Sequence, residues 1–245
     1  MSSQYQYTFK RYEMKYLLSA EKYTLLRQRL QDKLNEDKFG KTTICNIYFD
    51  TPDHRLIRSS LEKPIYKEKL RLRSYGTPEE GDTVFIEIKK KYKGIVYKRR
   101  EKMELSAAEA YLYDGEPACK STQITKEIDW FLKSYHGLSP AMYISYDRIA
   151  MYGIEDKELR VTFDSNLLWR EEELRLSSGV WGTPILEEGQ RLMEIKIPGT
   201  MPLWLAHILT ELEIYPASFS KYGRGYIGAQ QLKKNARIKG EKKYA

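Results

Sequence analysis

Residues 85–102, FIEIKKKYKGIVYKRREK, place eight Lys or Arg residues among strand-forming side chains. Phe85, Ile88 and Val96 belong to types that favour strands, and Lys93-Gly94 stands where a hairpin would turn. Like charges that face one another across a sheet are destabilising. A chain with this segment must therefore have something that compensates the cations.

The chain has 245 residues and a formal net charge of +8, enough for one large domain or two small ones. The charge suits nucleic acid, an anionic membrane surface or a polyanionic small molecule, and it does not separate the three. No apolar run approaches the ~20 residues of a membrane helix, the first residues lack a signal segment, and the two cysteines do not make a disulfide framework. A cytoplasmic location is therefore expected.

Alternation of charged and apolar residues predicts a mainly β fold with short helices, in the α+β class. Ser19 is typical of a helix N-cap, and Thr51 followed by Pro52 is typical of a second helix start. Expected strands cover 7–18, 42–50, 66–75, both arms of 85–102, 141–153, 158–167 and 191–199. Expected helices cover 19–34, 51–61, 106–114, 122–134, a segment after Pro202 and a last stretch into which SFSKYGRGY, residues 218–226, leads. No linker divides the chain, so one domain over 1–232 and a disordered basic tail over 233–245 are predicted.

The charges on these strands recur at every second position, which places them on one face of each strand. One interpretation is an antiparallel sheet with a single wet face, but cations dominate strand after strand. If the strands curl so that these faces point inward, they form a closed barrel of about eight strands with room for one elongated ligand. The residues concerned are Glu13, Lys15, Lys69, Arg71, Arg73, Glu87, Lys89, Lys91, Lys98, Arg100, Arg148, Arg160, Glu194 and Lys196.

An uncompensated cationic lumen would be costly, so the lining implies an anion, and arginines at i, i+2 suit phosphate oxygens. Carboxylates within such a site indicate a divalent cation, because Mg²⁺ or Mn²⁺ takes one or two carboxylates together with phosphate oxygens. Glu194 and Glu13 are the best candidates for this metal site. The alternative is that each neutralises the lysine two positions later, and Glu87 could serve either role.

Other motifs carry weaker signals. Gly223 and Gly225 in SKYGRG suit a phosphate-binding loop at a helix start, or simply the turn that enters a helix. Asp50 and Asp164 could act as ligands, but FDT before a proline-led helix and FDSN before a turn are typical of turn chemistry. Three widely separated histidines argue against a histidine-built zinc site, and no P-loop sequence is present.

Eight motifs in order resemble the VTC domain, the catalytic domain of the vacuolar transporter chaperone complex. They are RYEMKYLL, YFDT, KLRLRSYG, FIEIKKKYKGIVYKRR, YDR, LRVTFD, MEIK and SFSKYGRG. The family lies within the triphosphate tunnel metalloenzyme, or CYTH-like, superfamily, and the resemblance covers about residues 7–232. It implies a closed antiparallel β-barrel tunnel with flanking helices. The superfamily's opening E-x-E-x-K stands here as Arg11-x-Glu13-x-Lys15, which resembles the VTC branch rather than the hydrolase branches.

The resemblance also implies roles for individual residues. Glu194 would be the metal ligand, and Ser220 and Lys221 would contact the phosphate being transferred. The expected catalytic residues are Lys221, Arg71 and Arg73. The residues implied to hold the triphosphate and the growing chain are Lys15, Arg71, Arg73, Lys89, Lys98 and Arg148; the charge pattern adds Arg100 and Lys196 to the phosphate-binding set and Glu13 to the metal site.

The VTC branch makes inorganic polyphosphate from ATP with Mn²⁺ or Mg²⁺, so ATP, polyphosphate and one of these metals are the expected ligands. A hydrolase of tripolyphosphate or nucleoside triphosphates and a non-catalytic polyphosphate-binding protein stay open as alternatives. Nucleic acid is not expected, because glutamates within the lining disfavour a bare nucleic-acid groove. The phosphate-sensing domain and membrane helices of eukaryotic relatives are not found in the sequence. A separate membrane protein therefore stays open as a partner, and a monomer or weak oligomer is expected.

Overall fold

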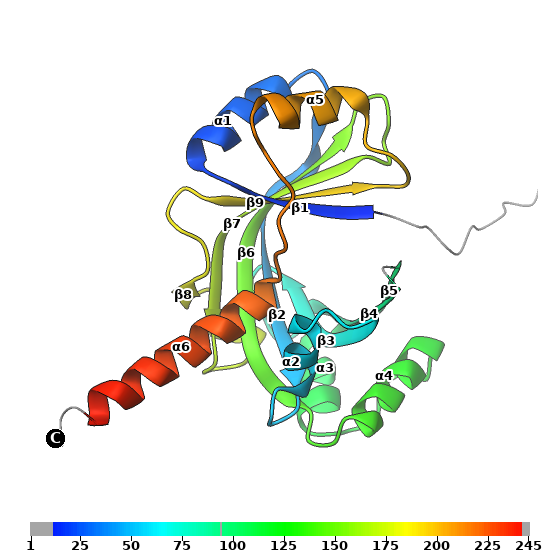
Figure 1. Ribbon diagram of the computed structural model, residues 1–245. Helices are drawn as coiled ribbons and strands as arrows, with labels where there is room; N and C mark the ends of the chain where they lie inside the picture. Colours follow the sequence, from blue (N-terminus) through cyan, green and yellow to red (C-terminus); the bar gives the residue numbers. More distant parts are fainter. Residues whose placement is uncertain (1–11, 94, 242–245) are drawn as a thin grey trace, which may run out of the picture. The chain divides into compact units, whose positions relative to one another are not determined.

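A computed structural model describes the backbone of residues 12–93 and 95–241 (Figure 1). The fold is α+β, with a mostly antiparallel sheet whose strands pair in the order β1-β9-β7-β6-β2-β3-β4-β5, while β8 pairs with β7. The chain divides into two compact units. Unit 1 consists of the described residues within 1–42, 147–165 and 186–218, and unit 2 of those within 43–146, 166–185 and 219–245.

Unit 1 contains a layer of strands covered on one face by two helices. β1 (Tyr12–Leu18) pairs with β9 (Arg191–Ile197), and β9 pairs with the beginning of β7 (Arg160–Arg170). α1 (Ala20–Arg29) and α5 (Leu203–Glu211) lie together over this layer (Figure 1). Strand residues such as Tyr16, Ile195 and Phe163 are buried against Leu26 and Ile208 of the helices. The intervening strand residues therefore lie on the face away from α1 and α5.

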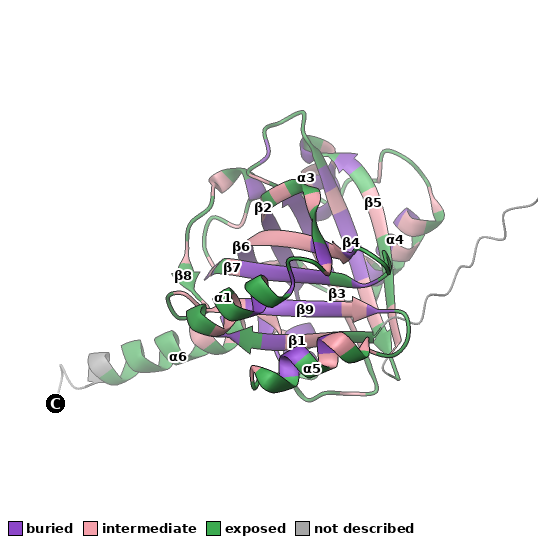
Figure 2. Ribbon diagram, turned by 90° about the horizontal axis from the view of Figure 1, so that it is seen from above, coloured by how far each residue is buried: buried purple, intermediate pink, exposed green. Residues whose placement is uncertain are grey.

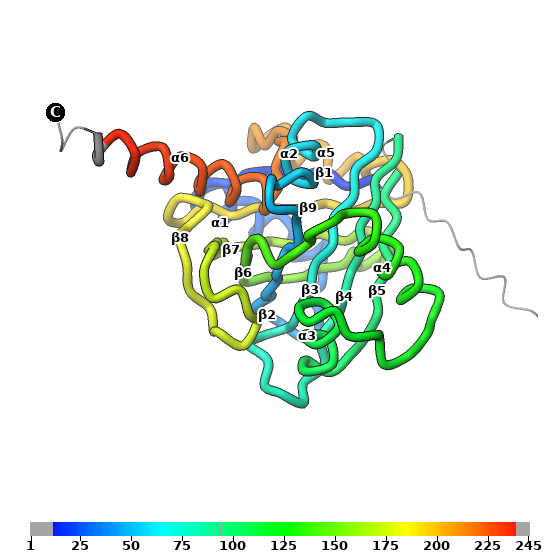
Figure 3. The backbone as a smooth tube through the Cα atoms, turned by 90° about the horizontal axis from the view of Figure 1, so that it is seen from below, coloured from blue at the N-terminus to red at the C-terminus, as the bar shows by residue number. Residues whose placement is uncertain are grey.

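Unit 2 repeats this design with four neighbouring strands. β2 (Leu34–Asp50), β3 (Tyr66–Tyr75), β4 (Thr83–Tyr92) and β5 (Ile95–Glu104) pair antiparallel in this order. α3 (Leu105–Tyr113) and α4 (Gln123–Ser134) cover one face of them (Figure 3). Ile47, Leu70 and Ile86 are buried there against Tyr111 and Phe131, and Figure 2 shows that buried residues run along these strands.

The remaining elements connect these layers. α2 (Arg55–Leu61) packs against the first turns of α6 (Lys221–Glu241). β6 (Ser139–Gly153), β8 (Thr183–Pro184) and a short 3₁₀ helix, Leu176–Ser178, complete the fold. No helix in the described part of the chain is long and apolar enough to cross a membrane.

The α+β class and the antiparallel pairing predicted from the sequence are confirmed. The hydrogen-bonded order has β1 at one end and β5 at the other, so no backbone ladder joins these two strands in the residues that the structure describes. Residues 7–11 of the first expected strand, Gly94 of the expected turn and residues 242–245 lie outside the described residues.

Several element boundaries differ from the predictions. The helix expected over 19–34 ends at Arg29, and β2 begins at Leu34, well before residue 42. The next helix begins at Arg55 after His54, which has a left-handed φ of 56°, although Thr51 Oγ1 still accepts a hydrogen bond from the Arg55 amide at 2.9 Å. α6 continues through Glu241, where a disordered tail from 233 was expected. Extending an existing helix needs no new nucleation, which favours helix over 233–241.

Candidate phosphate-binding site

The face of β3, β4 and β5 opposite α3 and α4 carries Lys69, Arg71, Arg73, Lys89, Lys98 and Arg100, whereas Arg99 Nε lies 3.6 Å from Oε1 of Glu127 in α4. The strand register places Arg71 opposite Glu87, and Glu87 opposite Arg100. One row further along, Lys69 faces Lys89 and Lys89 faces Lys98. The predicted grouping of these charges on one face is therefore confirmed within unit 2.

Glu87 is the carboxylate that compensates this cationic face. Its side chain is 1% exposed. Glu87 Oε2 accepts hydrogen bonds from Arg71 Nε at 2.8 Å and Nη2 at 2.6 Å. Oε1 accepts from Arg100 Nε at 2.7 Å and lies 2.8 Å from Lys98 Nζ, while Arg73 Nη1 lies 3.7 Å from Oε2. Both oxygens are thus engaged by cations, which supports the neutralising role for Glu87 over the metal-ligand role.

The electrostatics of this cluster follow from burial and charge together. Burial alone would raise the pKa of the Glu87 carboxyl, but the charges of Arg71, Arg73 and Lys98 outweigh it and hold the pKa well below its usual range. Burial lowers the pKa of Lys98 to about 8, although Glu87 partly opposes this shift. The carboxylate therefore stays ionised, while Lys98 titrates near neutral pH.

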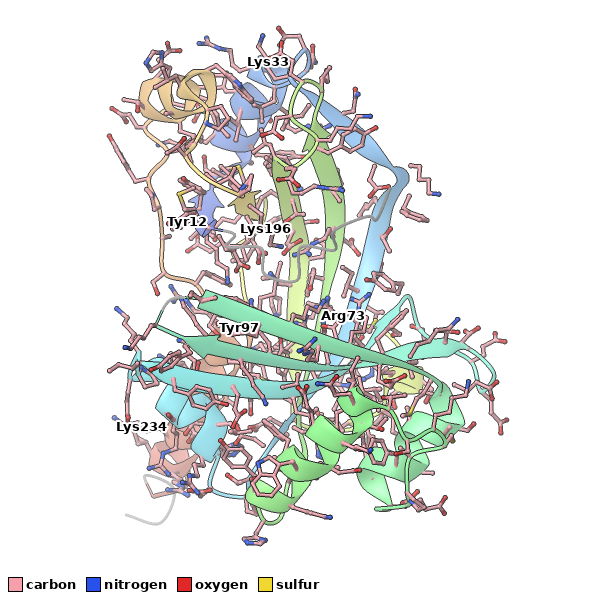
Figure 4. The ribbon with its side chains drawn as sticks, turned by 90° about the vertical axis from the view of Figure 1, so that its right-hand side faces the viewer. Tyr12, Lys33, Arg73, Tyr97, Lys196 and Lys234 are labelled. Atoms are coloured by element: carbon pink, nitrogen blue, oxygen red, sulfur yellow. The ribbon has the colours of Figure 1, made fainter. Side chains whose placement is uncertain are left out.

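Neutral side chains on the same face orient the two arginines. Arg71 Nη1 donates to the Tyr48 hydroxyl at 3.1 Å. Arg73 (Figure 4) donates from Nε to Asn46 Oδ1 at 2.8 Å and from Nη2 to the Tyr146 hydroxyl at 3.0 Å. Burial would raise the pKa of Tyr48, but the nearby positive charges, above all Arg71, lower it. This face holds Glu87 together with Lys69, Arg71, Arg73, Lys89, Lys98 and Arg100, and the excess of positive charge suits an anion.

The start of α6 brings Ser220 and Lys221 to this cluster. Ser220 Oγ accepts from the Gly223 amide at 3.1 Å and from Lys69 Nζ at 3.2 Å. Lys221 Nζ lies 4.5 Å from the ring centroid of Tyr146, the residue that also binds Arg73. The residues of SKYGRG from 221 onward are helical, so they form a helix entry rather than an extended phosphate-binding loop.

Asp50 and Tyr222 fix the direction of this helix start. The Tyr222 hydroxyl donates to Asp50 Oδ2 at 2.8 Å, and the Tyr222 ring stacks on Tyr48 at a centroid distance of 4.7 Å. The same carboxylate accepts the amides of Leu56 and Ile57 at 2.8 and 3.0 Å, in the first turn of α2. Asp50 therefore has the structural role that turn chemistry predicted for the FDT motif, and it also ties α6 to α2.

A second cationic cluster lies in unit 1, on the face away from α1 and α5. Lys15 faces Glu194 across β1 and β9, and Glu13 faces Lys196 (Figure 4). Glu194 is buried, with Lys196 Nζ and Lys15 Nζ 3.4 and 3.9 Å from its oxygens. Glu13 Oε1 lies 3.5 Å from Lys15 Nζ. The structure thus brings together the two proposed metal ligands and two of the proposed phosphate-binding lysines.

Arg148 of β6 joins this cluster through Asp164, for which the sequence allows a role as a ligand or as a turn residue. Arg148 donates from Nε to Asp164 Oδ1 at 2.6 Å and from Nη2 to Oδ2 at 2.7 Å, which is a two-bond fork. Arg148 Nη2 also lies 3.7 Å from Glu194 Oε2. Asp164 was expected to belong to a turn, but it is fully buried within β7 and orients Arg148.

The donor set of unit 1 fits a metal that is bound together with phosphate. In the described residues no group of three or more His, Cys, Asp or Glu side chains could hold an ion. Mg²⁺ and Mn²⁺, however, commonly use one or two carboxylates and complete their coordination with phosphate oxygens and water. Glu194, with Glu13 one row away, supplies such carboxylates, and the buried Thr162 hydroxyl opposite Glu194 has no hydrogen-bond partner in the described residues.

The motif order, the alternating charges and the two carboxylate-centred clusters agree with one family. The model of the VTC domain family matches residues 10–228. The chain belongs to the VTC domain family. A comparison with curated proteins gave no match.

Solved structures agree with this VTC domain at the level of the fold. A proposed adenylate cyclase from Bacillus halodurans is similar with a TM-score of 0.54 and 15% identity, covering 86% of this chain and 95% of its own. A proposed adenylyl cyclase from Hippeastrum, with a dominant triphosphatase activity, gives a TM-score of 0.53 and 16% identity over 88% of this chain and 95% of its own. These neighbours have the triphosphate tunnel, or CYTH-like, fold.

Proposed function

We propose that this VTC domain is a polyphosphate polymerase that transfers the γ-phosphate of ATP to a growing inorganic polyphosphate chain with Mn²⁺ or Mg²⁺. The observation that supports it best is the face of unit 2 around Glu87, where Arg71, Arg73, Lys98 and Arg100 all contact its carboxylate. Such a face favours a ligand with several adjacent negative charges. Membership of the VTC family favours ATP and polyphosphate as that ligand.

The reaction is an in-line phosphoryl transfer in which the protein forms no covalent bond. The terminal oxygen of the acceptor phosphate attacks the γ-phosphorus of ATP, the bond to the β,γ-bridging oxygen breaks, and ADP leaves. Such a transfer needs positioning and charge stabilisation more than acid–base chemistry. Glu194 and Glu13 would hold a divalent cation, which would supply charge neutralisation at the phosphate groups.

The chain's own residues divide this work. Arg71 and Arg73 bind phosphate oxygens with guanidinium groups whose direction is fixed by Glu87 and the neighbouring hydroxyls, and they act on ground and transition states alike. Lys221, at the first turn of α6, contacts the phosphate being transferred, with Ser220 beside it. The phosphate-binding residues that support them are Lys15, Lys89, Lys98, Arg100, Arg148 and Lys196. Glu194 and Glu13 hold the metal.

A hydrolase is the second candidate, and one observation favours it. The Hippeastrum protein that shares this fold has a dominant triphosphatase activity. The same cationic clusters would hold a triphosphate whether the nucleophile is water or an acceptor phosphate, because attack by either one needs the same positive charges around the triphosphate. The product of the reaction separates the two functions.

The test is incubation with ATP and Mn²⁺ or Mg²⁺, followed by electrophoresis of the products. A ladder of polyphosphate supports the polymerase, orthophosphate alone supports the hydrolase, and triphosphate binding without turnover in either metal supports a non-catalytic binder.

Variants test the assigned roles. Lys221→Ala should lose most turnover, by about 10²–10³ in kcat, while it still binds a non-hydrolysable ATP analogue. Lys234→Ala, an exposed lysine of the same helix (Figure 4), should keep wild-type turnover. Glu194→Gln should lose the metal-dependent activity. If Lys221→Ala keeps its kcat and only weakens binding, the role given to Lys221 is wrong.

A further inference from the structure

The Thr162 hydroxyl is a buried polar group next to Glu194 in unit 1. Thr162 lies opposite Glu194 across the β7–β9 ladder, and Lys15 lies opposite Glu194 on its other side. Opposed residues of an antiparallel ladder have Cβ atoms about 4.5–5.5 Å apart on the same face. The hydroxyl and the carboxylate are therefore neighbours in one row across three strands.

This hydroxyl has no structural partner in the part of the chain that the structure describes. Thr162 is 8% exposed, and its Oγ1 makes no hydrogen bond there. Val161 and Phe163, on the opposite face of β7, belong to the hydrophobic core. A buried hydroxyl without a hydrogen bond is costly, and valine would suit this strand position equally well. The position thus points to a ligand that the hydroxyl contacts.

We propose that the Thr162 hydroxyl is a second protein contact of the divalent cation that Glu194 binds, made directly or through a water on the metal. Hydroxyls of Ser or Thr contact Mg²⁺ in the same way at P-loop sites. A phosphate oxygen is the weaker alternative, because the charged donors Lys15 and Arg148 already lie beside Glu194. This inference takes one point from the proposed function, namely that phosphate groups of the substrate complete the coordination of the metal.

The experiment compares Thr162→Val, which removes only the hydroxyl, with Thr162→Ser, which keeps it. The binding of β,γ-imido-ATP is measured by calorimetry with Mg²⁺ and, separately, with EDTA. Thr162→Val should lose about tenfold of the affinity that Mg²⁺ adds, as is typical for groups that support a metal ligand. It should leave the metal-free affinity unchanged, and Thr162→Ser should behave like the wild type in both conditions.

Thermal unfolding without ligand supplies a readout that does not involve activity. Thr162→Val should melt no lower than the wild type, since no hydrogen bond is lost. Thr125→Val is the matched control, because Thr125 is also buried but its hydroxyl accepts from the Thr122 amide at 2.8 Å and donates to the Lys120 carbonyl at 3.1 Å. That variant should melt lower and keep the full Mg²⁺-dependent affinity.

The outcomes separate this inference from the proposed function. If Thr162→Val weakens metal-free binding equally, the hydroxyl contacts phosphate and the assignment to the metal is wrong. If it weakens neither, or if it melts clearly lower than the wild type, the inference is also overturned. A wild type whose affinity does not depend on Mg²⁺ overturns it whatever the product. Orthophosphate instead of a polyphosphate ladder refutes the polymerase and leaves the contact of Thr162 intact.

Discussion

Replacing Glu87 by glutamine should destabilise the protein, because Arg71, Arg73, Lys98 and Arg100 all contact this carboxylate. Breaking a buried ion pair by removing one partner costs about 3–5 kcal/mol. Arg71 and Arg73 have side chains that are 16% and 7% exposed, so the loss falls mainly on them. Lys98 and Arg100 are 40% and 34% exposed, and solvent screens their charges. We therefore expect a loss near the lower end, about 3 kcal/mol.

Thermal unfolding of Glu87→Gln, with and without tripolyphosphate, measures this effect. A loss of ~3 kcal/mol corresponds to a midpoint lower by about 6–12 °C in a protein of this size. Tripolyphosphate should raise the midpoint of the variant more than that of the wild type, because its negative charges replace the missing carboxylate and bind more tightly. Glu68→Gln is the control on the same pair of strands, since Glu68 accepts hydrogen bonds from the hydroxyls of Tyr66 and Tyr135 and not from cations.

The ligand-free midpoint decides the prediction. A Glu87→Gln variant as stable as the wild type would show that the four cations do not need this carboxylate. A variant that is destabilised but gains no more from tripolyphosphate than the wild type would show that the anion binds elsewhere.

Three further changes test parts of the site. Tyr222→Phe removes the hydrogen bond to Asp50 but keeps the ring, so kcat should fall about tenfold with little change in KM. The control Tyr111→Phe loses a comparable tyrosine–aspartate bond of 2.6 Å and should keep its kcat. Equal kcat values in the two variants would contradict this prediction. Lys98 has a pKa lowered to about 8, so it loses its charge as the pH rises from 7 to 9. The affinity for tripolyphosphate should therefore fall over this range in the wild type, and Lys98→Arg should remove this pH dependence. Identical pH profiles of the wild type and the variant would refute the prediction. Asp164→Asn should raise KM for ATP several-fold because it weakens the fork that orients Arg148; a lower melting temperature with unchanged KM would limit Asp164 to a structural role.

Alternation in the sequence predicted which strand residues share a face, because the side-chain period of a strand is two whatever the strand pairs with. Arg71, Arg73 and Lys89 were placed correctly for this reason, as was Glu194 with Lys196. The same rule applied to neutral residues would also have found Thr162 at the parity of Arg160 in 158–167, whereas Asn46 and Tyr48 lie on a strand without charges at alternate positions and are placed by their pairing with Arg73 and Arg71. Thr162 was missed because only charged residues were followed.

Partners across strands could not be predicted, because register depends on pairings between distant segments. The residues next to Glu87 in sequence do not indicate that it pairs with Arg71 and Arg100, and those next to Asp164 do not indicate that it binds Arg148. The length of α6 was missed for a different reason. Residues 233–241 lack an apolar period, but they follow a helix whose first turn is fixed by the bond from Tyr222 to Asp50.

The tripeptide Glu-Ile-Lys occurs twice, at residues 87–89 and 194–196, and its two copies have different roles. In both copies the glutamate is buried, the isoleucine packs in a core and the lysine returns to the glutamate's face. Glu87 accepts hydrogen bonds of 2.6–2.8 Å from Arg71 and Arg100, whereas Lys15, Arg148 and Lys196 lie 3.4–3.9 Å from the oxygens of Glu194. Two guanidinium groups therefore hold the Glu87 carboxylate through short charged hydrogen bonds, which are the strong ones. The same tripeptide thus provides a neutralising carboxylate in unit 2, while its copy in unit 1 places Glu194 in one row with Lys15 and Thr162.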